Sequence, residues 1–192
     1  TTSVNVNALP TANAGTPQTI CNGQSATLTA SGGGTYLWST GATTATITVN
    51  PTATTTYTVT VTNAAGCTST ATTSVNVNAL PTANAGTPQT ICNGQSATLT
   101  ASGGGTYLWS TGATTATITV NPTATTTYTV TVTSAAGCTS TANTTVNVNA
   151  LPTANAGTPQ TICNGQNATL TATGGGTYLW STGATTATIT VN

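Results

Sequence analysis

The sequence has 192 residues with no lysine, arginine, aspartate, glutamate or histidine, and its formal net charge is zero. General acid–base catalysis needs a histidine, a carboxylate or a lysine, and no base or cation is present to activate a Tyr or Cys, so we do not expect an enzyme. Nucleic-acid binding would need Lys or Arg, a Ca²⁺ site would need carboxylates, and a membrane span would need about 20 apolar residues in a row, so none of the three is expected.

The sequence repeats with a period of 71 residues, because Ile-Cys-Asn-Gly-Gln recurs around Cys21, Cys92 and Cys163. The copies differ at few positions, and each difference exchanges one polar residue for another. The period predicts a final strand of a preceding repeat in residues 1–8, followed by repeats over 9–79, 80–150 and 151–192. The third repeat is incomplete, since the equivalent of residues 51–71 is missing, and we expect the sequence to come from a longer array.

Apolar residues alternate with Thr, Ser or Asn along each repeat, which is the two-residue period of strands with one buried face. Turns such as Asn22-Gly23 and the glycine run 32–34 separate these segments. In the first repeat the pattern predicts strands over residues 12–20, 25–30, 35–39, 45–49, 56–62 and 67–78. Short strands of this number around a central Trp predict an all-β fold of tandem immunoglobulin-like β-sandwich repeats, forming a rod or filament.

The tryptophans and two of the tyrosines fit the core of such a sandwich. Trp38 lies within the third predicted strand, and Tyr57 opens the fifth, where a tyrosine corner would hydrogen-bond the backbone. We therefore predict core positions for Trp38, Trp109, Trp180, Tyr57 and Tyr128. The alternative is a sugar-stacking platform, as in a glycan-binding module, but the alternation of these side chains with Thr favours an inward direction.

Leu37 lies between Tyr36 and Trp38 and must therefore point to the opposite side of its strand. We expect Leu37, Leu108 and Leu179 to be exposed, one in each repeat. A regularly spaced apolar side chain is what lateral association of chains needs, and a net charge near zero favours association. These leucines are candidate self-association residues.

Each complete repeat has two cysteines, Cys21 before the first turn and Cys67 in the last one, with no other metal-ligating residue nearby. We interpret them as disulfide-forming, which implies an oxidising, extracellular location. Strand directions place Cys21 and Cys67 at opposite ends of one sandwich, too far apart for a bond. This favours a bond between consecutive repeats, Cys21 with Cys138, and leaves Cys67 for the preceding repeat and Cys92 and Cys163 for following ones. A Cys21–Cys67 bond, bonds between chains and free thiols remain as alternatives.

The motifs Leu-Pro-Thr-Ala-Asn-Ala-Gly (9–15), Ile-Cys-Asn-Gly-Gln (20–24) and Tyr-Leu-Trp-Ser-Thr-Gly (36–41) are characteristic, as are residues 57–62 and 66–68. The sequence resembles, over its whole length, the PKD-like and immunoglobulin-like repeats of giant secreted adhesins and extracellular filaments of Bacteroidetes-type bacteria. The resemblance implies export by type IX secretion, a place at the cell surface, bundling with further copies into filaments, and attachment to cells or surfaces through regions outside this sequence. The lack of acidic residues argues against a Ca²⁺-stiffened variant.

The function expected from these patterns is a structural repeat segment of an extracellular filament or adhesin, which provides length, stiffness and lateral self-association. No cofactor, metal or catalytic residue is predicted. The glycan-binding array remains the first alternative. A minor alternative is an ice-binding threonine array, suggested by the alternation of Thr and Val in residues 58–62, although the valines are better used as core.

Overall fold

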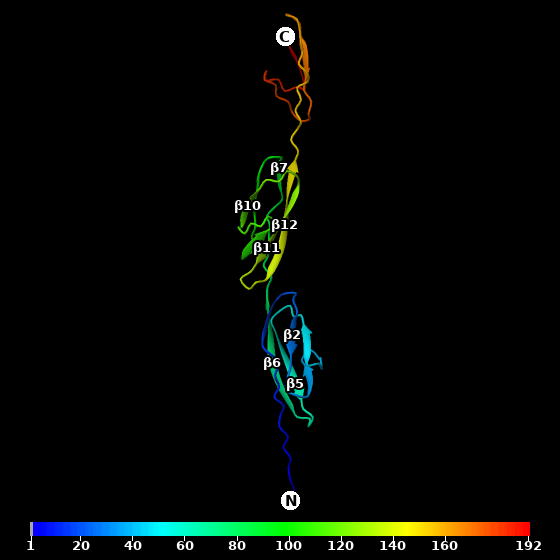
Figure 1. Ribbon diagram of the computed structural model, residues 1–192, viewed down its shortest axis with the longest axis vertical. Coiled ribbons are helices and arrows are strands. Elements are labelled where there is room, and N and C mark those ends of the chain that lie inside the picture. Colours follow the sequence, from blue (N-terminus) through cyan, green and yellow to red (C-terminus); the bar gives the residue numbers. More distant parts are fainter. Residues whose placement is uncertain (1) are drawn as a thin grey trace. The chain divides into compact units, whose positions relative to one another are not determined.

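The protein is described by a computed structural model over residues 2–192. All secondary-structure elements in this range are β-strands (Figure 1). In chain order, the strands of the first repeat are β1 (Gln18–Cys21), β2 (Ala26–Thr29), β3 (Thr35–Trp38), β4 (Thr46–Val49), β5 (Thr55–Thr62) and β6 (Thr68–Asn78). Those of the second repeat are β7 (Gln89–Cys92), β8 (Ala97–Thr100), β9 (Thr106–Trp109), β10 (Thr117–Val120), β11 (Thr126–Thr133) and β12 (Thr139–Asn149). Residues 151–192 contain β13 (Ala168–Thr171) and β14 (Thr188–Val191). Nothing in the described range is a helix long and apolar enough to cross a membrane.

The first repeat folds as two sheets with the strand order of an immunoglobulin-like sandwich. One sheet has the order β1-β6-β5-β3, and the other contains β2 and β4. β1 runs parallel to β6, and the remaining neighbours are antiparallel. The second repeat has the same order, with β7-β12-β11-β9 in one sheet and β10-β8 in the other. The chain is therefore built from tandem immunoglobulin-like β-sandwich repeats.

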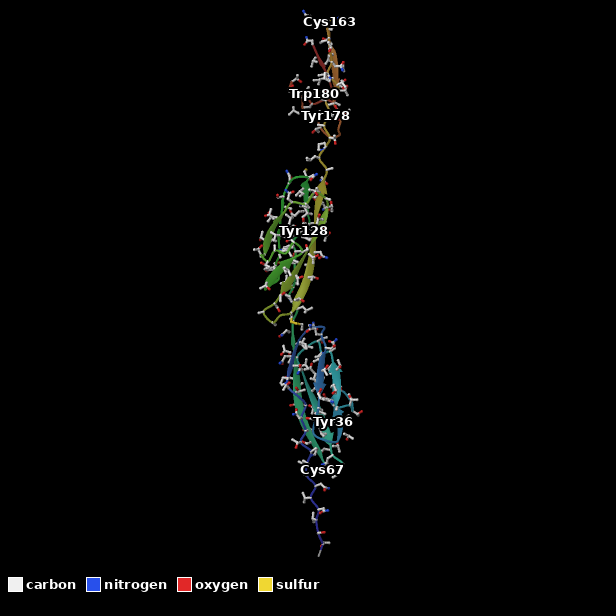
Figure 2. The ribbon with its side chains drawn as sticks, viewed as in Figure 1. Tyr36, Cys67, Tyr128, Cys163, Tyr178 and Trp180 are labelled. Atoms are coloured by element: carbon white, nitrogen blue, oxygen red, sulfur yellow. A yellow bond between two sulfur atoms is a disulfide. The ribbon has the colours of Figure 1, made fainter. Side chains whose placement is uncertain are left out.

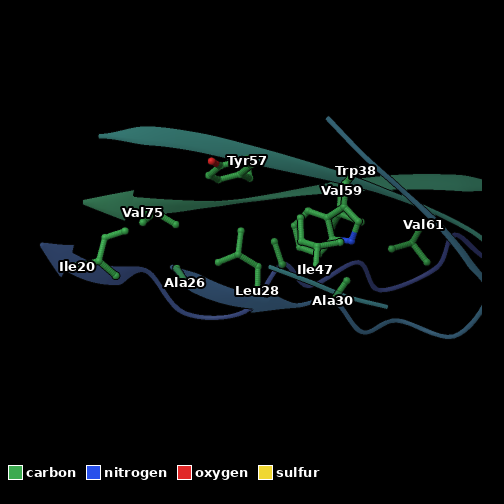
Figure 3. Close-up of a cluster of buried hydrophobic side chains, with 11 residues drawn as sticks. Ile20, Ala26, Leu28, Ala30, Trp38, Ile47, Tyr57, Val59, Val61 and Val75 are labelled. Carbon is green, nitrogen blue, oxygen red and sulfur yellow. The ribbon is translucent and has the colours of Figure 1, made fainter. Parts of the chain in front are cut away.

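The core of the first repeat lies between its two sheets, and Figure 3 shows side chains from both of them meeting there. Tyr57, Val59 and Val61 alternate with threonines along β5 and are buried, with the two valines 0% exposed. Leu28 and Ile47 face them from β2 and β4. The alternation in the sequence therefore corresponds to one buried face for each strand.

The first strand is shorter than the predicted 12–20 segment. Only Gln18–Cys21 pairs with β6, whereas Asn13 forms a separate bridge with Ser31, whose carbonyl accepts the Asn13 N–H at 2.9 Å. The change of sheet takes place between them, where Gly15 has a φ of 80° and Pro17 has no N–H to donate. The segment therefore begins against one sheet and ends against the other.

Residues 2–8 form no strand, contrary to the prediction of a final strand there. Val4 and Val6 are 88% and 89% exposed, whereas Val75, the equivalent of Val4, is 0% exposed. Val75 has partners on both sides, in β5 and in β1, and the segment 2–8 has no such neighbours in this sequence. The same residues form a strand in β6, where β1 and β5 pair with them, so the residue preferences of this segment alone do not produce a strand.

Candidate functional site

The end of β1 holds Cys21 at the point where the chain leaves the first sandwich. Cys21 pairs in register with Asn78, the last residue of β6. The Asn22 N–H donates to the Asn78 carbonyl at 2.9 Å, and the Gln24 side-chain oxygen accepts the Cys21 N–H at 3.0 Å. Gly23 closes this turn with a φ of 88°. The backbone around Cys21 is therefore fixed by hydrogen bonds on both sides.

Cys138 lies in the turn between β11 and β12 and is 1% exposed. The Ser134 N–H donates to the Cys138 carbonyl at 2.8 Å, and the Gly137 N–H donates to the Ser134 carbonyl at 2.9 Å. The Ser134 hydroxyl also accepts the Cys138 N–H at 3.2 Å. This turn presents the Cys138 sulfur immediately before the first residue of β12.

Cys21 and Cys138 form a disulfide, with their Cα atoms 5.6 Å apart and a sequence separation of 117. This is the bond between consecutive repeats that the sequence favoured. A Cys21–Cys67 bond is ruled out by the length of β6, because Cys67 directly precedes this 11-residue strand and Cys21 lies beside its last residue. At roughly 3.3 Å per residue the two cysteines are about 36 Å apart, far beyond disulfide range.

The other three cysteines, Cys67, Cys92 and Cys163, form no disulfide within residues 2–192. Cys67 and Cys163 are labelled in Figure 2. Cys92 pairs in register with Asn149 as Cys21 does with Asn78, so it occupies the equivalent position in the second repeat. With a period of 71 residues, its counterpart of Cys138 would stand beyond residue 192. The bonds expected for these three cysteines remain predictions.

The turn that carries Cys67 lies against the segment that precedes the first repeat. The Asn63 side chain donates to the Ala8 carbonyl at 2.8 Å, and the Cys67 thiol lies 3.9 Å from the Asn7 carbonyl. The Asn63 side-chain oxygen also accepts the Cys67 N–H at 2.9 Å. Cys67 is therefore positioned where the chain enters the sandwich, at the end that Cys138 occupies in the second repeat.

The structure places four of the five predicted core aromatics inside. Trp38 and Trp109 are 2% exposed, and Tyr57 and Tyr128 are 8% exposed. The Trp38 indole N–H donates to the Thr44 carbonyl at 3.0 Å. No hydrogen bond from the Tyr57 hydroxyl is found among the described residues, so the expected tyrosine corner is not formed. The buried rings of Trp38 and Trp109 offer no surface on which a sugar could stack.

Trp180 differs from the core position predicted for it, because it is partly exposed. Its indole N–H still donates to the Thr186 carbonyl at 2.9 Å, as in the other repeats. In the first repeat β5 pairs with β3 at Trp38, and β6 is the next strand of the sheet, whereas neither strand has an equivalent within residues 151–192. The local sequence around Trp180 is the same as that around Trp38, so the greater exposure of Trp180 reflects the strands that this repeat lacks.

The three leucines lie on the outer side, with Leu37 and Leu108 53% exposed and Leu179 80% exposed. On the sheet β1-β6-β5-β3, Leu37 is in register with Thr60 of β5, which is in register with Thr70 of β6. Thr58 and Thr62, along β5, point to the same side. Leu37 is thus a single apolar side chain on an uncharged face of threonines. The valines between these threonines are buried and do not contribute to a surface array.

No protein-family model matches the sequence, and no curated protein matches it either. Among solved structures, an I-band fragment of titin aligns at 15% identity over 88% of this chain and 77% of the fragment, with a TM-score of 0.40. The N-terminal Ig domains of Down Syndrome Cell Adhesion Molecule align at 16% identity over 87% of this chain and 32% of that one, with a TM-score of 0.37. Fibronectin(III)-like modules of CbhA from Clostridium thermocellum align at 9% identity over 70% of this chain and 90% of that one, with a TM-score of 0.35. The immunoglobulin-like character of the repeats is given by their own sheet order.

Proposed function

We propose that this chain is a structural repeat segment of an extracellular bacterial filament or adhesin, of the kind exported by type IX secretion. The observation that carries the proposal is the Cys21–Cys138 disulfide, which joins two nearly identical repeats. A disulfide between repeats persists in an oxidising compartment and makes two modules into one mechanical unit. The sequence has no charged side chain for catalysis, and in this proposal the repeats have a structural role. The adhesive target would be contacted by other regions of the protein.

The repeating unit in this proposal is the 71-residue period, with repeats over 9–79, 80–150 and 151–192 and a preceding unit that ends within residues 1–8. In a longer array the same disulfide would recur at every junction. Cys67 would bond to the preceding repeat, and Cys92 and Cys163 to following ones. The equivalent placement of Cys92 and Cys21 beside the last residue of β12 and β6 supports this recurrence.

Lateral association of such chains would use the exposed leucines Leu37, Leu108 and Leu179, of which Leu37 and Leu108 lie in register with threonines of the neighbouring strand. An uncharged surface lacks the electrostatic repulsion that normally keeps soluble proteins apart. One exposed leucine per repeat adds an apolar contact at a regular interval. Together these features favour side-by-side bundling of identical chains.

The experiment is imaging by electron microscopy of the oxidised protein, combined with sedimentation over a range of concentrations. We expect regular filaments and an association that weakens in the variant L37T/L108T/L179T. The matched control is L9T/L151T, which changes leucines that are 70% and 60% exposed but lie outside the strands. Single chains that stay monodisperse at high concentration would contradict bundling, and equal effects of both variants would contradict the assigned face.

A further inference from the structure

We propose that the Cys21–Cys138 disulfide is a tension bypass, which carries a pull on the chain around residues 22–137 so that strands β2–β11 of the first two repeats bear no load. The inference goes beyond the proposed function, because it follows from the covalent connectivity of a single chain and needs neither filaments nor a particular organism. It concerns which bonds carry force when the two ends of the chain are pulled apart.

The covalent path explains the bypass. The disulfide closes a loop with a sequence separation of 117. A pull applied before Cys21 and after Cys138 passes through the two sulfur atoms. Residues 22–137 therefore bear no tension while the bond is intact. This loop holds β2–β6 and β7–β11, and with them both buried tryptophans, Trp38 and Trp109.

The strands that stay in the load path are those that lead directly to the bond. β1 ends at Cys21, and β12 begins one residue after Cys138. Each is therefore pulled along its own length, from one end to the other. Without the disulfide, a pull would pass from β1 to β6 through their parallel pairing, which spans only Gln18↔Val75 to Cys21↔Asn78. Pulling parallel neighbours by opposite ends shears those backbone hydrogen bonds. The disulfide replaces this short ladder by a covalent link.

The local geometry fixes both ends of the bypass. The Gln24 side chain and the Asn78 carbonyl hold the turn at Cys21, with bonds of 3.0 and 2.9 Å. The pairing of Ser134 with Cys138 closes the turn before β12. The backbone at each cysteine is therefore held by hydrogen bonds, and a pull on the disulfide does not first extend a flexible loop.

The test is single-molecule force spectroscopy of the full 192-residue chain held at its two ends, in the background C67S/C92S/C163S, which leaves one disulfide available. Because the bond removes a separation of 117 from the path, about 75 residues remain to be extended in the oxidised chain. At roughly 3.5 Å per residue this is a final length of about 260 Å, against about 670 Å after reduction. The difference of about 410 Å is the expected signal.

Two variants sharpen the test. Adding Cys21→Ser to the background should give the long extension with or without reductant. Adding Trp38→Ala should leave the oxidised traces unchanged and, after reduction, lower the force at which the first repeat unfolds or abolish that event. An oxidised chain that extends to about 670 Å overturns the proposal, and so does a Trp38→Ala effect in the oxidised state. If Trp38→Ala fails to fold, the oxidised length of the background protein alone still decides.

Discussion

Replacing Trp38 by alanine should cost about 4 kcal/mol of the free energy of unfolding of the first repeat. Trp38 is 2% exposed and packs among the buried residues of both sheets, as Figure 3 shows. Its removal leaves a cavity between the sheets and takes the indole donor away from the Thr44 carbonyl, 3.0 Å from it. A domain of this length has a total stability of about 4–10 kcal/mol, so the variant repeat should be unfolded or close to unfolding.

Unfolding in guanidinium is monitored by amide hydrogen exchange, in β2–β6 for the Trp38 variants and in β13 and β14 for Trp180→Ala. This readout reports on each repeat separately and does not rely on tryptophan fluorescence. Trp180→Ala is the matched control, because it removes the same side chain from the same local sequence at a partly exposed position, and it should cost about 1 kcal/mol. Trp38→Phe, which keeps a ring and loses the N–H, should fall between the two. Equal, small losses for Trp38→Ala and Trp180→Ala would refute the core role and revive the sugar-stacking platform.

Three further predictions concern single positions and pH. Gly34→Ala should cost about 3 kcal/mol in a denaturant titration, because Gly34 has a φ of 144° and a Cβ would collide with the Thr62 carbonyl, whereas Gly33→Ala, with open space around it, should cost only about 1 kcal/mol. Thr73→Val should stabilise the first repeat by about 1 kcal/mol in thermal unfolding, because the Thr73 hydroxyl is buried without a hydrogen-bond partner among the described residues. The control Thr72→Val, at an exposed position, should change the stability little. A loss of stability in Thr73→Val would show that the hydroxyl makes a hydrogen bond. The free energy of unfolding should stay constant between about pH 5 and 7, since the sequence has no side chain that titrates there, and a slope in urea unfolding across this range would contradict that view.

The strands of the complete repeats could be predicted from the sequence because one face of each is buried. In β5 the alternation of Tyr57, Val59 and Val61 with threonine fixes both the element and its inward side. The outward position of Leu37 follows from the same alternation. The disulfide partner of Cys21 could be inferred from two arguments. Strand direction places Cys21 and Cys67 at opposite ends of a sandwich, and the order of the repeats brings the end that carries Cys138 next to the end that carries Cys21.

Features that depend on partners could not be predicted in this way. The first strand changes sheets near Gly15, since Asn13 bridges Ser31 and Gln18–Cys21 pairs in parallel with β6, and a local alternation pattern does not encode which sheet edge a strand joins. Val4 and Trp180 have the same local sequence as Val75 and Trp38, yet they are more exposed because the strands that cover their equivalents are missing. The direction of the Tyr57 hydroxyl likewise depends on backbone positions that the pattern leaves open.

The small core of each repeat explains why a disulfide is needed, and the length of β6 explains where it forms. Three of the eleven residues in the core cluster of the first repeat are alanines, Ala14, Ala26 and Ala30, so a repeat of this size needs stabilisation from elsewhere. The length of β6 prevents a bond between the two cysteines of one repeat, and the bond that forms instead reaches the next repeat. In the chain-entropy model a loop of this size stabilises the folded state by about 4–5 kcal/mol. Because the closed loop includes parts of both repeats, unfolding one repeat frees only part of the loop, and the disulfide therefore links the stabilities of the two repeats. The same bond diverts tension from strands β2–β11.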